Sequence, residues 1–330
     1  MTSPKVEIQS TLPHTHSLLK SLFSLPTRTE CQASWELCRL HNNIGFWVVW
    51  LPTAWSITMA YCAYGQKNIS VLDVVRLAGT YVPLCFGIKS LIMAIDDILD
   101  ADVDGLVQRT KMRPLPRGAI TAERAWLFFF LQVVMGVYVA YEFLPPPVRR
   151  ISMWAWPLYI IYPTCKRWTN LAPIPLGLMF NIGVFMGWVH TMGSDEATPW
   201  TMLRLVYLAA CLWTFTYETV YQHQDKKDDI IIGLHSPALL LGSYTKPICA
   251  TTGLGFFALF AYAGWLNGQG VGFFIALLCA AAMLFSKLIT TNIDVPNDCR
   301  EFFLKTVPIG QVILIGLVVD AGVITWAKSQ

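Results

Sequence analysis

The hydrophobic positions of this chain fall into long runs that short polar segments separate. A helix needs about 20 mainly apolar residues to cross the hydrocarbon core of a bilayer, and many of the runs approach or reach that length. Prolines interrupt some runs, but neighbouring helices can satisfy the backbone groups that a proline frees. The pattern predicts an all-α bundle of nine transmembrane helices, at residues 45–65, 75–95, 119–142, 148–164, 173–191, 200–221, 246–266, 270–292 and 307–327.

Composition supports this interpretation. Of 330 residues, 55% are hydrophobic and 14% are charged, with a mean hydropathy of +0.48, whereas soluble domains carry about 25% charged residues. We therefore expect an integral multi-pass membrane protein in contact with lipid. The net charge of +3 is too small to indicate binding to nucleic acid. The nine cysteines are scattered without a C-x-x-C pair, which argues against a zinc site and against a disulfide framework.

The chain is expected to form one membrane domain at residues 43–330, preceded by a cytoplasmic N-terminal segment at residues 1–42. Within that segment, residues 17–25 fit either an interfacial helix or a disordered lead-in. Lys and Arg are concentrated in the N-terminal segment and in alternate loops, and the positive-inside rule places those loops in the cytoplasm. Acidic residues and few arginines make the N-terminus untypical of a mitochondrial presequence, so we expect the endoplasmic reticulum membrane.

Two acidic segments follow predicted spans on that cytoplasmic side. The first, IDDILDADVDGLVQRTKMRPLPRG at residues 95–118, holds five aspartates and then a basic run. The second, ETVYQHQDKKDD at residues 218–229, mixes three aspartates with two lysines. On a helix, residues three or four positions apart share a face, with Cβ atoms about 5–6 Å apart. That spacing recurs in Asp96/Asp100, Asp97/Asp100, Asp100/Asp104 and Asp225/Asp229.

Carboxylates this close repel one another unless a cation lies between them. Mg²⁺ prefers oxygen ligands and usually binds through one or two carboxylates together with substrate phosphates, while Arg and Lys complete phosphate sites. A single charged run at a helix end is more often a solvated cap, but two matched runs on one side favour a shared Mg²⁺–diphosphate site. A diphosphate at the mouth of an apolar bundle indicates an isoprenoid substrate, with its tail among the helices.

The chain resembles the UbiA superfamily of intramembrane prenyltransferases over residues 36–325. The resemblance is carried by ELCRLHNNIG at 36–45, by DxxDxxxD followed by RTKxRPL in the first acidic segment, and by YPTCKRWT at 162–169. It continues in FNIGVFMGW at 180–188 and in Y-x-x-x-D-x-x-x-D at 221–229. The resemblance implies helices around a central cavity that opens laterally to lipid. It also implies Mg²⁺-dependent transfer of a prenyl group from its diphosphate to an acceptor, usually an aromatic ring.

The resemblance also implies roles for individual residues. The catalytic carboxylates that hold Mg²⁺ and diphosphate would be Asp97, Asp100, Asp104, Asp225 and Asp229, with Asp96 as a further metal ligand. Lys111, Arg113 and Lys226 would contact the diphosphate, and Tyr221 belongs to the second motif. Arg39 and Asn181 are candidates for the donor or acceptor region. His223, two residues before an acidic position, is the best candidate for a proton acceptor.

Departures from the family pattern leave the acceptor open. Asp96 replaces the family's asparagine, which creates a DDxxD sequence as in soluble terpene synthases, and Lys89–Met93 is more apolar than its family counterpart. We expect prenyl transfer to an aromatic or polyketide-type acceptor in terpenoid or meroterpenoid secondary metabolism, with farnesyl or geranylgeranyl diphosphate as donor. The alternative is a terpene cyclase that uses the same donors without an acceptor. A transporter that uses the acids as an ion path is a third and weaker hypothesis.

Overall fold

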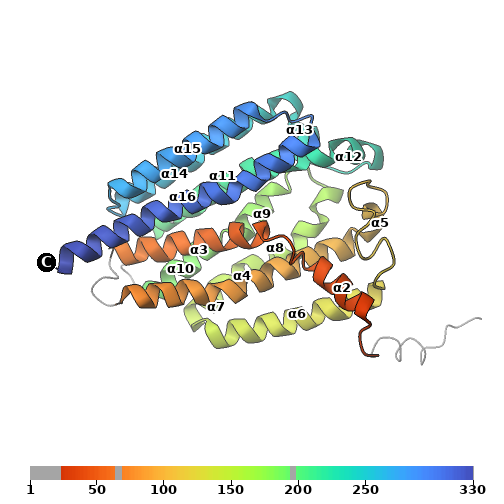
Figure 1. Cartoon of the computed structure of the whole chain (residues 1–330), viewed down its shortest axis with the longest axis horizontal. Helices are drawn as coiled ribbons and strands as arrows, with labels where there is room; N and C mark the ends of the chain where they lie inside the picture. Colours follow the sequence, from red (N-terminus) through yellow and green to blue (C-terminus); the bar gives the residue numbers. More distant parts are fainter. Residues whose placement is uncertain (1–23, 64–68, 194–197, 330) are drawn as a thin grey trace, which may run out of the picture.

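The computed structural model describes residues 24–63, 69–193 and 198–329. These residues form helices and connecting turns without a strand. The longer helices are α2 (Arg28–Leu37), α3 (Ile44–Ala63), α4 (Val71–Leu99), α6 (Ala122–Phe143), α9 (Pro173–Phe180), α10 (Gly183–Met192), α11 (Trp200–Gln222), α14 (Thr245–Leu266), α15 (Val271–Thr290) and α16 (Pro296–Ser329). Figure 1 shows the long helices running along the bundle, with the short helices α5 (Ala101–Asp104) and α12 (Lys226–Ile232) at one end.

Every predicted span overlaps helical structure in its described residues, but nine uninterrupted transmembrane helices are not confirmed. Within the described residues, five segments are long and apolar enough to cross a membrane by length and composition: Ala122–Phe143, Pro173–Met192, Pro237–Leu266, Val271–Thr290 and Pro296–Ala327. The last begins eleven positions before the predicted start at 307, because its polar first turns extend the helix into the end that carries the acidic segments.

The predicted span 148–164 is a chain of short pieces: α7 (Pro146–Ser152), η2 (Met153–Ala155), α8 (Trp156–Ile161) and η3 (Tyr162–Arg167). Pro157 and Pro163 each lie in the first turn of a new piece, where a missing N–H costs little, whereas inside a helix a proline breaks the ladder. The span 173–191 is likewise divided, because α9 ends at Phe180 and α10 begins at Gly183.

Aromatic side chains fill the centre of the bundle. Trp55 of α3, Trp213 of α11 and Phe256 of α14 are fully buried, and the Trp55 and Trp213 ring centroids lie 5.2 Å apart. Small residues bring α10 against α3: a Cβ added at Gly187 would lie 2.7 Å from the Thr53 carbonyl oxygen. The close packing fixes α3 and the helices around it as one unit.

Helix α2 is attached to the bundle by charge and by apolar contact. Its Glu30 pairs with Arg124 of α6 at 2.9 Å, and Glu36 pairs with Arg117 at 2.7 Å. Leu37 is buried in a small apolar cluster with Ile98 and Ile120. The domain boundary between residues 42 and 43 stays a prediction, although α2 packs on the bundle that follows it. The interfacial helix expected at 17–25 lies almost entirely outside the described residues.

Candidate active site

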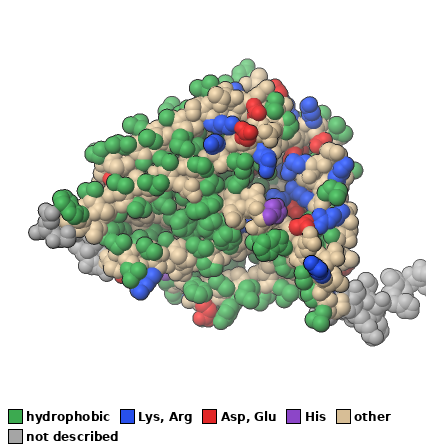
Figure 2. Space-filling view, viewed as in Figure 1, with side chains coloured by type: hydrophobic (Ala, Val, Ile, Leu, Met, Phe, Trp, Pro, Cys, Tyr) green, Lys and Arg blue, Asp and Glu red, His purple; other side chains and the backbone are tan. Residues whose placement is uncertain are grey.

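Charged side chains gather at one end of the molecule, over the end of α4, the turn-rich segment 105–121 and the start of α12. Figure 2 shows this end as a concentration of Lys, Arg, Asp and Glu beside a largely hydrophobic surface. Both acidic segments belong to it, so the sequence-based placement of the two segments on the same side agrees with the structure. The bundle thus presents an apolar body with one polar mouth.

Arginines pair with two buried carboxylates of the first acidic segment. Helix α4 carries Asp97 in its last turn, and the Asp97 Oδ1 atom lies 2.9 Å from Arg39 Nη2 and 3.1 Å from Arg113 Nη1. Arg113 also donates to Asp104 Oδ2 at 2.6 Å. Asp97 and Asp104 are both buried, and a buried carboxylate requires a charged or hydrogen-bonding partner. Arg113 therefore ties the end of α4 to α5.

The second acidic segment is joined to the first by an arginine fork. Helix α11 ends at Gln222 and the chain turns through η4 (His223–Asp225) into α12. Arg109, from the basic run after the first segment, donates through Nε to Asp225 Oδ1 at 2.8 Å and through Nη2 to Asp225 Oδ2. Burial acts to raise the pKa of Asp225, but Arg109 outweighs it and holds that pKa below its usual range.

Four aspartates from the two segments line one small cavity of about 20 Å³. That volume holds roughly one water-sized particle. The charged residues that line it are Asp100, Asp104, Asp225 and Asp229, with Arg109, Arg113 and Lys166. Burial alone would lower the pKa of Lys166, but Asp100, Asp225, Asp96 and Asp229 outweigh it and raise that pKa. Lys166 is therefore a positive charge that the carboxylates of both segments share.

The donor set suits a hard divalent cation. Burial raises the pKa of Asp229 to about 6, with Asp225 and Asp228 adding to the shift. Burial also raises the pKa of Asp100, and Asp104 adds to it. Carboxylates in excess of their cations fit Mg²⁺, which takes oxygen ligands. Among the described residues, however, no three His, Cys, Asp or Glu side chains are already arranged around one metal position. Arginines pair instead with Asp97, Asp104 and Asp225.

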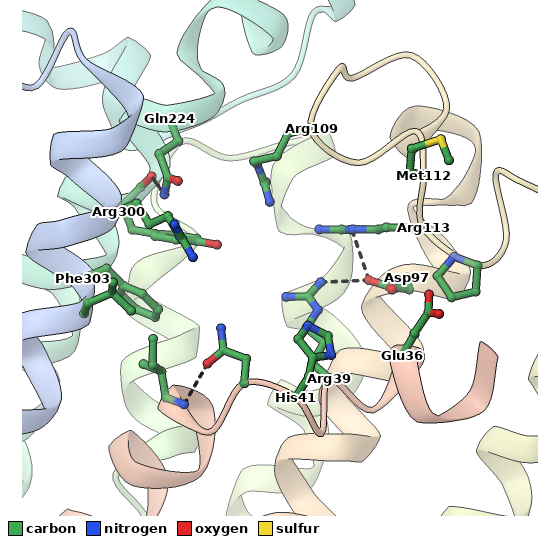
Figure 3. A pocket seen from close by; sticks show the side chains of 15 residues that line it. Glu36, Arg39, His41, Asp97, Arg109, Met112, Arg113, Gln224, Arg300 and Phe303 are labelled. Atoms are coloured by element: carbon green, nitrogen blue, oxygen red, sulfur yellow. Dashed lines mark hydrogen bonds and ion pairs between the residues drawn. The ribbon is translucent and has the colours of Figure 1, made fainter. Parts of the chain in front are cut away.

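A larger cavity of about 630 Å³ lies beside this cluster (Figure 3). Arg109 and Arg113 line both cavities. Asp97 and Arg39 line the larger one together with Tyr221. The remaining lining residues come from the α2–α3 region, the segment after α5, the α11–η4 turn and the start of α16: Glu36, His41, Asn42, Ile44, Met112, Pro114, Gln224, Arg300, Phe303 and Leu304.

Several candidates from the sequence are not brought into either cavity. Lys111 lies exposed on the segment after α5, and the Lys226 ammonium lies 3.9 Å from Asp294. Asp96 lines neither cavity, although its charge reaches Lys166. Asn181 is buried at the α9–α10 break, where its amide donates to the Gly177 carbonyl and to Thr214. Their assigned roles stay predictions.

His223 likewise lines neither cavity. Its imidazole is buried, with Nε2 2.9 Å from the Thr245 hydroxyl at the start of α14. This geometry gives no support to the prediction that His223 accepts a proton from a substrate in the mouth.

Four cations were missed as site residues, and one of them is Arg109, which lines both cavities. Lys166 and Arg167 lie in YPTCKRWT, a motif that the sequence analysis recognised without assigning its charges. Arg167 donates to Asp102 at 2.8 Å and lies 3.9 Å from Asp100. Arg300 lies in the first turns of α16, and its sequence surroundings gave no signal because only the packing of α16 brings it to the cavity.

Comparisons with known proteins agree with this arrangement. Residues 48–309 match the model of the UbiA prenyltransferase family. The chain is 30% identical to the mitochondrial 4-hydroxybenzoate polyprenyltransferase of Schizosaccharomyces pombe, over 86% of this chain and 78% of that protein. It is 34% identical to the protein of the same name from Caenorhabditis elegans, over 86% and 77%. The mitochondrial relatives conflict with the expected endoplasmic reticulum location, and these transferases give no support to the terpene cyclase alternative or to secondary metabolism.

Solved structures share the fold. The apo structure of a UbiA homolog from Aeropyrum pernix K1 superposes with a TM-score of 0.63 at 25% identity, covering 81% of this chain and 97% of that one. A UbiA homolog from Archaeoglobus fulgidus bound to GPP and Mg²⁺ gives a TM-score of 0.61 at 17% identity, covering 85% and 99%. The family match spans most of the chain, and the relatives named above are prenyltransferases. This chain therefore belongs to the UbiA prenyltransferase family and is a prenyl-transferring enzyme of the membrane.

Proposed function

We propose that the protein ionises an isoprenyl diphosphate with the help of Mg²⁺ and transfers the prenyl group to an aromatic acceptor of the 4-hydroxybenzoate type. The observation that supports this most is the small cavity that Asp100 and Asp104 of one segment line together with Asp225 and Asp229 of the other, with Lys166 also in its wall. The names of the relatives support the acceptor class, and the homolog bound to GPP and Mg²⁺ supports the donor and the metal.

Asp100, Asp104, Asp225 and Asp229 would hold the metal, with Asp97 beside them. When bound, Mg²⁺ supplies charge stabilisation for the departing diphosphate. The arginines then have a second use: Arg39, Arg109 and Arg113 reach the mouth cavities and present bidentate forks, which match phosphate oxygens as well as carboxylates. Binding of metal and diphosphate would exchange the carboxylate partners of these arginines for phosphate partners.

In the reaction, the bond between C1 of the prenyl chain and the diphosphate oxygen breaks, and its electron pair leaves with the diphosphate. The cations around the cavities stabilise that negative charge. The aromatic faces of Tyr221 and Phe303 at the larger cavity can stabilise the allylic cation. The acceptor ring then forms the new carbon–carbon bond at C1, and the ring proton passes to the released diphosphate, which restores aromaticity. Farnesyl and geranylgeranyl diphosphate remain the proposed natural donors, and geranyl diphosphate, which the Archaeoglobus fulgidus homolog binds, serves as the shorter donor in the experiments below.

The experiment compares neighbouring aspartates in membranes that contain the full chain. Geranyl diphosphate, 4-hydroxybenzoate and Mg²⁺ are supplied, and prenylated acid is quantified. Asp229→Asn should reduce turnover at least about 100-fold, as expected for loss of a group that stabilises transition-state charge. Asp228→Asn is the matched control, because Asp228 lines neither cavity. Equal activity of Asp229→Asn and wild type would refute the site, and hydrocarbon formation without an acceptor would favour cyclisation.

A further inference from the structure

The larger cavity carries more positive than negative charge. Four arginines line it, at 39, 109, 113 and 300, against two acids, Glu36 and Asp97. Glu36 is already paired with Arg117, which lies outside the lining, and Asp97 is shared by Arg39 and Arg113. The lining is therefore complementary to an anionic ligand.

Arg300 differs from the other three arginines. Arg39, Arg109 and Arg113 each pair with an aspartate of the acidic segments, and these are the aspartates expected to bind metal. Within the part of the chain that the structure describes, Arg300 has no carboxylate partner, and it does not line the small cavity. Its guanidinium is thus available to an anion other than the metal-bound diphosphate.

Helix α16 places apolar and aromatic surface beside that guanidinium. Arg300, Phe303 and Leu304 are spaced i, i+3 and i+4, so they share one face of α16, and all three line the cavity. The Phe303 ring packs on Tyr221 with centroids 4.3 Å apart. Figure 3 shows Arg300 and Phe303 on the side of the cavity opposite Asp97 and Arg113. A flat ring could therefore lie against Phe303 while its acidic group reaches Arg300.

We propose that this face of α16 is the acceptor subsite, and that Arg300 determines specificity by binding the carboxylate of an aromatic acid. The planar fork of arginine matches a carboxylate with two parallel hydrogen bonds. The acceptor would then lie on the α16 side and the diphosphate on the side of the acidic segments, so the ring faces the C1 carbon as the bond to diphosphate breaks. This inference rests on the proposed function and specifies which chemical class the acceptor belongs to.

The test compares two acceptors that differ in charge. Full-length protein in membranes receives Mg²⁺, geranyl diphosphate and either 4-hydroxybenzoate or 4-hydroxybenzyl alcohol, which keeps the phenol and lacks the carboxylate. Arg300→Gln should raise the KM for 4-hydroxybenzoate about 10- to 100-fold, the range expected for a lost hydrogen bond to a charged group. The KM for geranyl diphosphate and the turnover of the neutral alcohol should change less than about two-fold by the same principle. Arg300→Lys should recover part of the loss, because it restores charge without the fork.

Lys305→Gln is the control, since Lys305 is an exposed cation on α16 that lines neither cavity. Three results would overturn the inference: an equal loss with both acceptors, a raised KM for the donor, or no change in Arg300→Gln, which would mark Arg300 as a solvated surface residue. Failure of the proposed function looks different, because wild-type protein would then prenylate neither acceptor.

Discussion

The Lys89 ammonium holds the backbone of Arg39. It donates to the Arg39 carbonyl oxygen at 2.5 Å and to that of Cys38 at 2.9 Å, at the end of α2. Lys89 is buried inside α4, two helical turns before Asp97, which binds the Arg39 side chain. Arg39 has a φ of 47°, a left-handed conformation that costs a residue with a side chain about 1 kcal/mol or more. Helix α4 therefore binds Arg39 at its backbone carbonyl through Lys89 and at its guanidinium through Asp97, which holds the guanidinium at the cavity.

Lys89 lines neither cavity, but Lys89→Met should still reduce activity through its effect on Arg39. Two carbonyl groups lose their partner, and Arg39 can leave its strained conformation, so we expect kcat/KM to fall about 10-fold or more. Lys89→Arg should retain part of the activity, because it keeps a cation that can donate to both carbonyls. Steady-state kinetics with varied geranyl diphosphate measures the effect.

Lys246→Met is the matched control for this substitution. Lys246 also donates to a helix-end carbonyl, that of Ile289 at 2.9 Å, but it lines neither cavity. If Lys246→Met and Lys89→Met lower kcat/KM equally at equal folded yield, positioning of Arg39 is not the cause.

The sequence predicted those features of the site that depend on residues close together in the chain. Long apolar runs placed the helices, and i, i+4 aspartates on two segments placed the acids at one mouth. The ion pairs of the site join residues that are far apart in the chain. Arg109 and Asp225 are separated by 116 positions, and Lys166 lies near the acids only because η3 folds beside them. Spacing within a segment cannot supply such pairings. The division of the predicted span 148–164 into short helices was missed because mean hydropathy is taken over the whole segment and does not register the breaks at Pro157 and Pro163.

Metal and diphosphate should stabilise the protein cooperatively. The arginines that pair with Asp97, Asp104 and Asp225 compete with a cation for the same oxygens, whereas a diphosphate offers these arginines new partners. We expect Mg²⁺ with a thio analogue of geranyl diphosphate to raise Tm more than the sum of the shifts for each ligand alone. Thermal denaturation in detergent measures this, and EDTA should cancel the joint effect.

Arg109→Gln serves as the comparison for this linkage. The substitution removes the two hydrogen bonds from Arg109 to Asp225. Mg²⁺ alone should therefore shift the Tm of the variant more than the Tm of wild type. A purely additive response in wild type, or an unchanged Mg²⁺ response in the variant, would contradict the exchange of partners.

The attachment of α2 to α6 should depend on pH through Glu30. The backbone N–H of Thr27 and the Arg124 guanidinium lower the pKa of Glu30 from its ordinary value of 4.5. A lowered folded-state pKa contributes stability above pH 4.5, and that contribution is lost as the pH falls through the folded-state value. Glu30→Gln should therefore be less stable than wild type at neutral pH, by about 1 kcal/mol or less for a partly exposed pair.

The difference in Tm between Glu30→Gln and wild type should narrow as the pH is lowered below 4.5, because Glu30 of the unfolded chain then takes up a proton, and it should vanish below the lowered folded-state pKa. Glu142→Gln, at an exposed position near the other end of α6, is the control for the loss of a surface carboxylate. A Tm difference for Glu30→Gln that stays constant from pH 7 to pH 3.5 would mean that the Glu30–Arg124 pair does not hold α2.

Close packing of α10 on α3 gives a prediction for the membrane-embedded core. A Cβ at Gly187 would lie 2.7 Å from the Thr53 backbone oxygen and 3.2 Å from Ile57, and a backbone atom cannot move aside as a flexible side chain can. Gly187→Ala should therefore force the two helices apart and destabilise the protein by about 1–3 kcal/mol, the usual cost of overpacking. Gly79→Ala is the control, since a Cβ there meets nothing within 4 Å and should stabilise α4 by about 0.5–1 kcal/mol. Tm in detergent distinguishes them, and a Gly187→Ala protein as stable as Gly79→Ala would show that α3 and α10 can separate without loss.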